Sequence, residues 1–229
     1  MLGTIVNAVA VAVGCIVGLM VRGRFNEKIS TTIMNGLALC VIYIGISGAL
    51  KGDDTLQIII CITIGALTGE IIDIDHKLNK LGKYIENRIN KSENNGKEKI
   101  SIAEGFVTSS LLFCVGAMAV VGALESGLQG NHTTLFAKSI LDGVSSIIFT
   151  SSLGIGVIFS AIAILIYQGS ITLLAGVLSG VLTDSVISNM SAVGSLLILG
   201  LGFNMLGISK IKVANLLPAI VVPIIFGLF

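Results

Sequence analysis

Long apolar runs dominate this chain of 229 residues and leave few folds open to it. Several runs approach the roughly 20 residues that a helix needs to cross a hydrocarbon core. The mean hydropathy is +0.98 and only 12% of the residues are charged, so a soluble domain could not bury this much apolar surface. The runs lack the alternation of barrel strands, and a backbone in lipid must bond to itself. We therefore predict an all-α, polytopic transmembrane helical bundle.

About eight helices are expected, at residues 2–21, 32–50, 55–73, 103–124, 141–167, 171–187, 190–208 and 213–229. The first could be mistaken for a secretory signal, but Arg22 and Arg24 follow it and no basic residue precedes it, which favours a retained helix. Pro218 and Pro223 interrupt the last segment. That segment either crosses the bilayer or re-enters it, so seven spans remain an alternative.

The basic residues predict the orientation of these helices. With the N-terminus outside, Lys51 and Lys138 are the two basic residues left on the outer side. The other twelve of the 14 lie in the cytoplasm: Arg22, Arg24, Lys28, Lys77, Lys80, Lys83, Arg88, Lys91, Lys97, Lys99, Lys210 and Lys212. This split is the one that the positive-inside rule expects. We predict an outside N-terminus and a cytoplasmic loop at 74–102.

A weak internal repeat relates two parts of the chain. Segments of residues 3–73 recur in order within 105–184, and matched pairs at offsets of 102, 107 and 111 are Gly3 with Gly105, Asn35 with Asp142, and Gly65 with Gly176. A block of three helices makes its copy begin on the other side of the bilayer, which is the inverted repeat typical of transporters. Chance matches in a chain with 28 glycines are the alternative. The predicted parts are a first repeat (1–73), an amphipathic helix and linker (74–102), an inverted repeat (103–187) and two further helices (188–229).

The polar stretch after residue 73 has helical period at its start, where Ile74, Leu78, Leu81 and Ile85 share one face. Residues 92–99 read as a flexible join. An amphipathic helix beside the membrane can contact anionic lipid through its basic residues, here Lys77, Lys80, Lys83 and Arg88. The alternative is a linker that happens to be amphipathic.

Small residues at four-residue spacing predict helix packing, because lipid supplies no hydrophobic drive between helices. The packing candidates are Gly14, Gly18, Gly65, Gly69, Gly176 and Gly180. Such faces also predict a homo-oligomer, with a dimer as the simplest form.

Few polar residues lie at membrane depth, and these are the candidates for a substrate or ion pathway. They are Asn7, Asn35, Glu70, Asp73, Ser109, Asp142, Ser145, Ser146, Thr150, Ser152, Asp184 and Asn204. The hydroxyls of helix 141–167 suit a wetted cavity, or they bond back to their own helix. Asn35 and Asp142 open their predicted helices, so N-capping also explains them.

No Lys or Arg lies within a predicted span, whereas Glu70 and several aspartates do. A cation, a neutral polar solute or a proton would suit these carboxylates better than an anion. The sequence therefore predicts a small transporter or channel, with proton coupling through Glu70. The alternative is a membrane interaction or scaffold protein through which nothing crosses.

We expect that the protein is not an enzyme and that it binds no cofactor, metal or nucleic acid. Its expected partner is the lipid bilayer. Motifs such as HExxH are absent from the sequence. Neither the cysteines, which we interpret as small buried hydrophobes, nor the histidines have ligand-like spacing: Cys15, Cys40, Cys61, Cys114, His76 and His132.

The chain resembles a family of bacterial multi-pass membrane proteins, the YdfK/YqgA-like proteins, grouped as a domain of unknown function. The likeness rests on the opening Met1-Leu2-Gly3-Thr4-Ile5-Val6-Asn7-Ala8, on Asn35-Gly36-Leu37, on the run at 65–70 and on Asn215-Leu216-Leu217-Pro218-Ala219. It implies a bacterial plasma (inner) membrane and assigns no functional residues.

Overall fold

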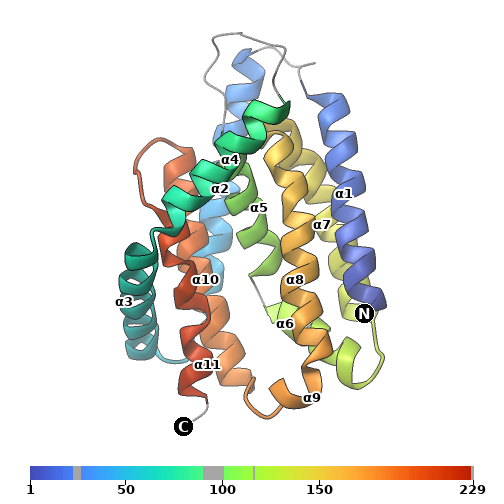
Figure 1. Ribbon diagram of the computed structural model, residues 1–229, viewed down its shortest axis with the longest axis vertical. Coiled ribbons are helices and arrows are strands. Elements are labelled where there is room, and N and C mark those ends of the chain that lie inside the picture. Colours follow the sequence, from blue (N-terminus) through green and yellow to red (C-terminus); the bar gives the residue numbers. More distant parts are fainter. Residues whose placement is uncertain (23–26, 90–100, 116, 228–229) are drawn as a thin grey trace.

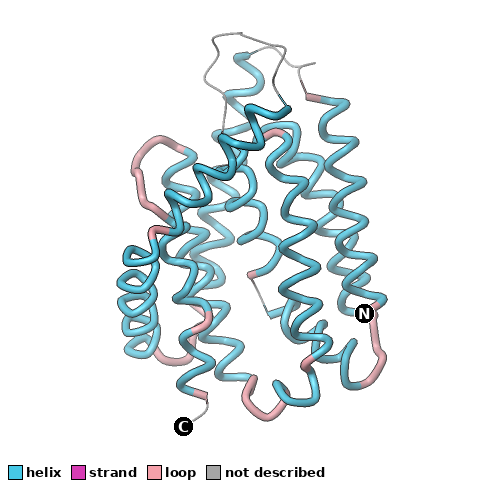
Figure 2. The backbone as a smooth tube through the Cα atoms, viewed as in Figure 1, coloured by secondary structure: helices cyan, strands magenta, loops and turns pink. Residues whose placement is uncertain are grey.

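The computed structural model describes residues 1–22, 27–89, 101–115 and 117–227 (Figure 1). Every regular element within these ranges is a helix (Figure 2). Five of the described helices are long and apolar enough to cross a membrane: α1 (Leu2–Val21), α2 (Glu27–Ala49, from Thr31), α3 (Thr55–Ile72), η1 with α8 (Ile155–Phe159 and Ser160–Leu173) and α10 (Asp184–Met205). α5 (Ile102–Cys114) and α6 (Ala117–Leu128) form a bent pair. If this pair counts as one further span, the number of candidate spans among the described residues is six. The all-helical class is confirmed, whereas the count of eight spans is not.

The remaining elements are α4 (Ile74–Ile89), α7 (Thr133–Leu153), α9 (Ala175–Leu178), η2 (Val213–Ile220) and α11 (Val222–Phe226). In Figure 1, α4 crosses one end of the bundle, and both chain termini lie toward the other end. The flexible join 92–99, with Arg24 and Lys91, falls outside the described residues.

The predicted helix 141–167 is wrong, because two helices occupy this part of the chain. α7 ends at Leu153, and Gly154 has a φ of 82°, in a region that favours glycine. A Cβ on Gly154 would also lie 2.3 Å from Nη1 of Arg22. η1 and α8 follow this break.

The start of α7 is also earlier than predicted. Asn131 Oδ1 accepts hydrogen bonds from the Thr133 N–H at 3.1 Å and from the Thr133 hydroxyl at 2.8 Å, which fixes the turn where α7 begins. Lys138, which we expected in an outer loop, therefore lies inside α7 and is 6% exposed. The expectation that no lysine lies among the bundle helices is wrong.

The predicted helix 171–187 is absent from the structure. α8 ends at Leu173, α9 is one short turn, and α10 begins at Asp184, where the Thr183 side chain accepts a hydrogen bond from the Val186 N–H. Among the described residues, neither Gly176 nor Gly180 packs against another helix, because a Cβ built on either would meet no atom of a neighbouring element within 4 Å. The predicted helix 103–124 is likewise divided, by a 60° bend between α5 and α6.

α1 and α7 run parallel and in close contact along their length. Gly3 faces Leu135 near the start of both helices, and Gly18 faces Ile147 and Thr150 near their ends. A Cβ on Gly14 would lie 2.3 Å from the Gly143 carbonyl oxygen, and one on Gly18 would lie 2.6 Å from that of Ile147. The two backbones approach this closely because these positions carry no side chain.

Two further interfaces hold the other half of the bundle together. α2 packs antiparallel to α10, where Gly45 meets Leu199 and Gly48 meets Ser195. α3 packs against η2 through Gly65 and Gly69, which lie against Ala219 and Asn215. α10 is the most enclosed of the five candidate spans, because 72% of its most apolar stretch is buried inside the bundle.

The outer surfaces of α1, α2 and α3 are apolar, with exposed side chains such as Met20, Leu39, Tyr43 and Ile71. This pattern suits helices that face lipid. Of the four free cysteines, Cys15 and Cys61 are buried, but Cys40 is exposed on α2, so the expectation of buried thiols is wrong there.

Candidate functional site

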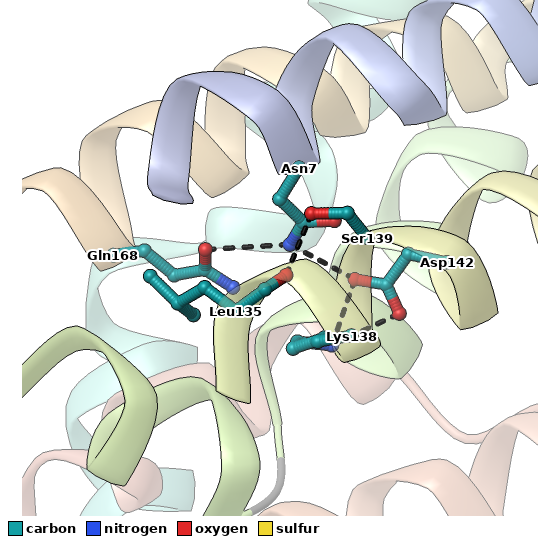
Figure 3. Close-up of polar contacts among 6 residues, drawn as sticks. All are labelled: Asn7, Leu135, Lys138, Ser139, Asp142 and Gln168. Carbon is teal, nitrogen blue, oxygen red and sulfur yellow. Dashed lines mark hydrogen bonds and ion pairs between the residues drawn. The ribbon is translucent and has the colours of Figure 1, made fainter. Parts of the chain in front are cut away.

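A cluster of buried polar side chains joins α1, α7 and α8, and we call it the α1–α7–α8 cluster (Figure 3). Its members are Asn7, Lys138, Asp142 and Gln168, of which none is more than 6% exposed. Lys138 Nζ lies 2.7 Å from Oδ2 and 2.9 Å from Oδ1 of Asp142. Asn7 Nδ2 donates to Asp142 Oδ2 at 3.1 Å and to Gln168 Oε1 at 3.3 Å.

The helix geometry of α7 explains how the cluster forms. Lys138 and Asp142 are four residues apart, so they lie one turn apart on the same helix face. The close approach of α1 at Gly14 brings Asn7 of that helix within reach of Asp142. Ser146, one turn further, donates to the Val11 carbonyl at 3.1 Å and ties the two helices again.

Two atoms of the cluster have hydrogen-bonding capacity left over. Asn7 Oδ1, an acceptor, and Gln168 Nε2, a donor, are buried and have no partner among the described residues. A buried polar group without a partner costs about 1–3 kcal/mol, so sites of this kind need an explanation. A polar solute held at the cluster would offer partners to both.

A break in a helix lies next to the ion pair. α5 packs against α7, and its last residue, Cys114, lies close enough to Lys138 and Asp142 for their charges to act on its thiol. The chain then extends at Val115, with φ −85° and ψ 133°, before α6 leaves at 60°. Because the last carbonyls of a helix lack partners in that helix, the end of α5 brings further acceptors to this region.

Glu70 belongs to a different place, near the α4 end of α3. Its Oε1 lies 2.8 Å from Lys212 Nζ, and its Oε2 accepts a hydrogen bond from Asn215 Nδ2 at 2.6 Å. The side chains of Glu70 and Lys212 are 60% and 56% exposed. The bond to Glu70 raises the pKa of Lys212 above its ordinary value. Glu70 is thus exposed and paired, which removes our reason for expecting it to carry protons.

Asn35 and Asp142 do not cap helices, because both lie well inside α2 and α7. Asn35 is exposed on α2, away from the cluster. Asp73 ends α3 in the left-handed conformation, with φ 54°, and Asp184 is exposed in the first turn of α10. The repeat pairs these two aspartates as counterparts, but their positions in the structure are not equivalent.

The remaining candidates serve local bonds or lie beside the cluster. Ser109 donates to the Gly105 carbonyl at 2.7 Å, which is back-bonding to its own helix. Asn204 holds the turn after α10 through Ser209 and Ile211. Ser145 and Ser152 are half-buried on α7, and Thr150 is buried on the same helix beside Cys15.

Two members of the cluster, Lys138 and Gln168, are absent from the pathway residues predicted from the sequence. Two signals in the sequence favour a helix around Lys138: its spacing of four from Asp142, and the turn-forming Asn131 that comes before it. Gln168 fell beyond the end of the predicted helix 141–167. Within the part of the chain that the structure describes, no group of three His, Cys, Asp or Glu side chains is placed to hold a metal ion.

This bundle of apolar helices, five of them long enough to cross a membrane among the described residues, defines a multi-pass membrane protein. The chain belongs to the family described as "Protein of unknown function (DUF554)", whose model matches residues 2–228, and this confirms the resemblance seen in the sequence. It is 32% identical over 227 residues to the "Uncharacterized membrane protein YdfK" of Bacillus subtilis (strain 168), covering 97% of this chain and 94% of that protein. It is 31% identical over 219 residues to the "Uncharacterized protein YqgA" of Escherichia coli (strain K12), covering 96% and 93%. No solved structure matches the chain significantly.

Proposed function

We propose that this protein is a small transporter or channel and that the α1–α7–α8 cluster is its substrate site. The observation that carries the proposal is the buried Lys138–Asp142 pair beside the break between α5 and α6. Ionisable side chains inside a membrane protein are costly and are usually tied to the movement of ions or polar solutes. Broken helices supply the binding groups in many secondary transporters.

The composition of the cluster favours a neutral polar or zwitterionic solute. Lys138 and Asp142 carry opposite charges, so the cluster has no net charge to attract a simple cation. A zwitterion could exchange partners with the pair, its anionic group meeting Lys138 and its cationic group meeting Asp142. The sequence predicts a cation because no lysine lies within a predicted span. Lys138, which is buried in α7, removes that reason.

The parallel course of α1 and α7 supports an inverted repeat. In such a repeat, the second helix of the copy runs in the same direction as the first helix of the original. Shifting α2 by the offset of 107 gives residues 134–156, close to Thr133–Leu153 of α7. The matched pair Gly65 and Gly176 does not support the inverted repeat, because Gly176 lies in the short helix α9.

The orientation that we propose has the N-terminus outside and α4 in the cytoplasm of a bacterial inner membrane. In Figure 1, α1 ends at the end of the bundle that α4 crosses, and α2 ends at the opposite one. In the sequence, Arg22 follows α1, Lys77 and Lys80 lie in α4, and Lys51 follows α2. This arrangement follows the positive-inside rule.

A homodimeric scaffold is a second candidate function, and one surface favours it. The outer face of α1 and α7 carries an open apolar groove of about 680 Å³, whose floor includes Ala10, Gly14 and Gly143. Small residues of this kind let helices of a second copy approach. A scaffold of this type would not need the buried ion pair, so removing the pair separates the two candidates.

Ligand screening tests the proposed site. We would measure the thermal unfolding of the detergent-purified protein with panels of amino acids, sugars, polyols and simple salts. A solute that binds the folded state raises its apparent stability by mass action. We expect a neutral or zwitterionic compound to stabilise the wild type but not Asn7→Ala, and to keep stabilising Asn35→Ala, which changes an exposed asparagine outside the cluster. Equal stabilisation of both variants would contradict the assignment of the site.

A further inference from the structure

Two apolar grooves meet on one side of the bundle, below α4. The larger, of about 610 Å³, lies between α4, α5 and α8. The smaller, of about 270 Å³, lies between α5, α8 and the segment from η2 to α11. Both are lined by Phe106, Ala163 and Tyr167, so the two grooves adjoin at these residues.

The larger groove has the length of a lipid tail. Its wall on the end of η1 and on α8 extends from Phe159 to Ile171, which at about 1.5 Å per residue corresponds to roughly 18 Å. One leaflet of a hydrocarbon core is about 15 Å deep, half of the roughly 30 Å total. Leu78 and Leu81 of α4 close the end of the groove that lies nearest the membrane surface.

Exposed basic side chains lie on α4 directly beside these two leucines in the sequence. Lys77, Lys80 and Lys83 are all exposed on α4, and they alternate with the leucines that reach into the groove. The acidic residue Asp75 of α4 lines a separate cavity with Asn79 and Glu104. The mouth of the groove therefore combines a positive rim with an apolar interior, and basic pockets of this kind on the cytoplasmic side bind anionic lipid headgroups.

We propose that the joined grooves bind one anionic phospholipid with two acyl chains. One chain lies along α8 in the larger groove, the second enters the smaller groove past Phe106, and the headgroup anion meets Lys77, Lys80 and Lys83. The second chain would contact Val115, the extended residue at the end of α5. This site is independent of the proposed transport function, and its lipid would pack against the broken helix.

Native mass spectrometry of the detergent-purified protein tests this site, with dioleoylphosphatidylglycerol and dioleoylphosphatidylcholine added in equal amounts. We expect the wild type to retain one phosphatidylglycerol in preference to phosphatidylcholine. Replacing Lys77, Lys80 and Lys83 together by Gln should reduce that preference by about tenfold or more, since each basic residue near a membrane surface adds attraction. The matched control, Lys51→Gln with Lys210→Gln, changes exposed lysines that line neither groove and should leave the preference unchanged.

A second variant tests the tails separately from the headgroup. Ala163→Phe fills the junction of the grooves and should reduce retention of both lipids, whereas Ile140→Phe, on the exposed face of α7, should not. Equal retention of the two lipids by the wild type would overturn the proposal. The proposal would also be overturned if the triple lysine variant kept its preference for phosphatidylglycerol. Full retention of both lipids by a folded Ala163→Phe protein would overturn it as well.

Discussion

Lys138 Nζ lies 2.7 Å from Asp142 Oδ2, and these two charged groups are both buried inside a bundle whose outer surface is apolar. Asn7 reaches the same carboxylate from α1, so the pair also connects two helices. An ion pair in this position gives a weak or no advantage in stability over well-packed apolar side chains. Its presence therefore points toward a role in function.

The stability of single and double variants should show this balance. Asp142→Leu leaves the Lys138 charge buried without its partner, which we expect to cost about 3–5 kcal/mol. Lys138→Met combined with Asp142→Leu removes both charges and should recover most of that loss. Chemical unfolding in mild detergent measures both values. A double variant as unstable as the single one would show that the pair holds the fold together.

The contact between α1 and α7 predicts a second pair of results. Gly14→Ala places a Cβ 2.0 Å from Ser146 Oγ and 2.3 Å from the Gly143 carbonyl, so we expect a loss of about 1–3 kcal/mol from overpacking. Gly36→Ala is the control, because no atom lies within 4 Å of its Cβ position. That change should be neutral, or stabilise α2 by up to about 1 kcal/mol through helix propensity. Thermal unfolding that ranks the two variants in reverse would refute this packing.

The helices of the first half were predictable because each apolar run ends in clear polar signals. The predicted 2–21 and 55–73 agree closely with Leu2–Val21 and Thr55–Ile72, and the amphipathic pattern from Ile74 identified the start of α4. In the second half the apolar pattern continues through Gly154, so hydropathy alone joined α7 to α8. The start of that predicted helix at residue 141 also left Lys138 outside it. The cluster was hidden for this reason and because its members lie on three helices far apart in the sequence.

The Glu70–Lys212 pair should behave differently from the buried pair. Both side chains are more than half exposed, so Lys212→Gln should change stability little. The raised pKa of Lys212 means that the pair contributes fully below the ordinary lysine pKa and is lost as the pH rises through the higher folded value. Unfolding measured between about pH 6 and 9 should therefore show a constant small difference from the wild type. A large loss at neutral pH would contradict this account.

Labelling of single cysteines tests the orientation. In a background without the native cysteines, Lys51→Cys should react with a membrane-impermeant maleimide in intact cells, because we propose that this end of the bundle faces outward. Lys80→Cys on α4 should react after the cells are opened. The reverse pattern would invert the proposed topology, and equal labelling of both sites in intact cells would contradict a single orientation.

Solute flux into proteoliposomes tests the central claim most directly. The protein would carry the solute that stabilises it in the ligand screen, and the variant to compare is Lys138→Met with Asp142→Leu, which removes the charges but keeps an apolar interior. We predict rapid uptake by the wild type and uptake at the level of empty liposomes by the folded double variant. Uptake by the double variant at the wild-type rate would contradict a substrate site at Lys138 and Asp142.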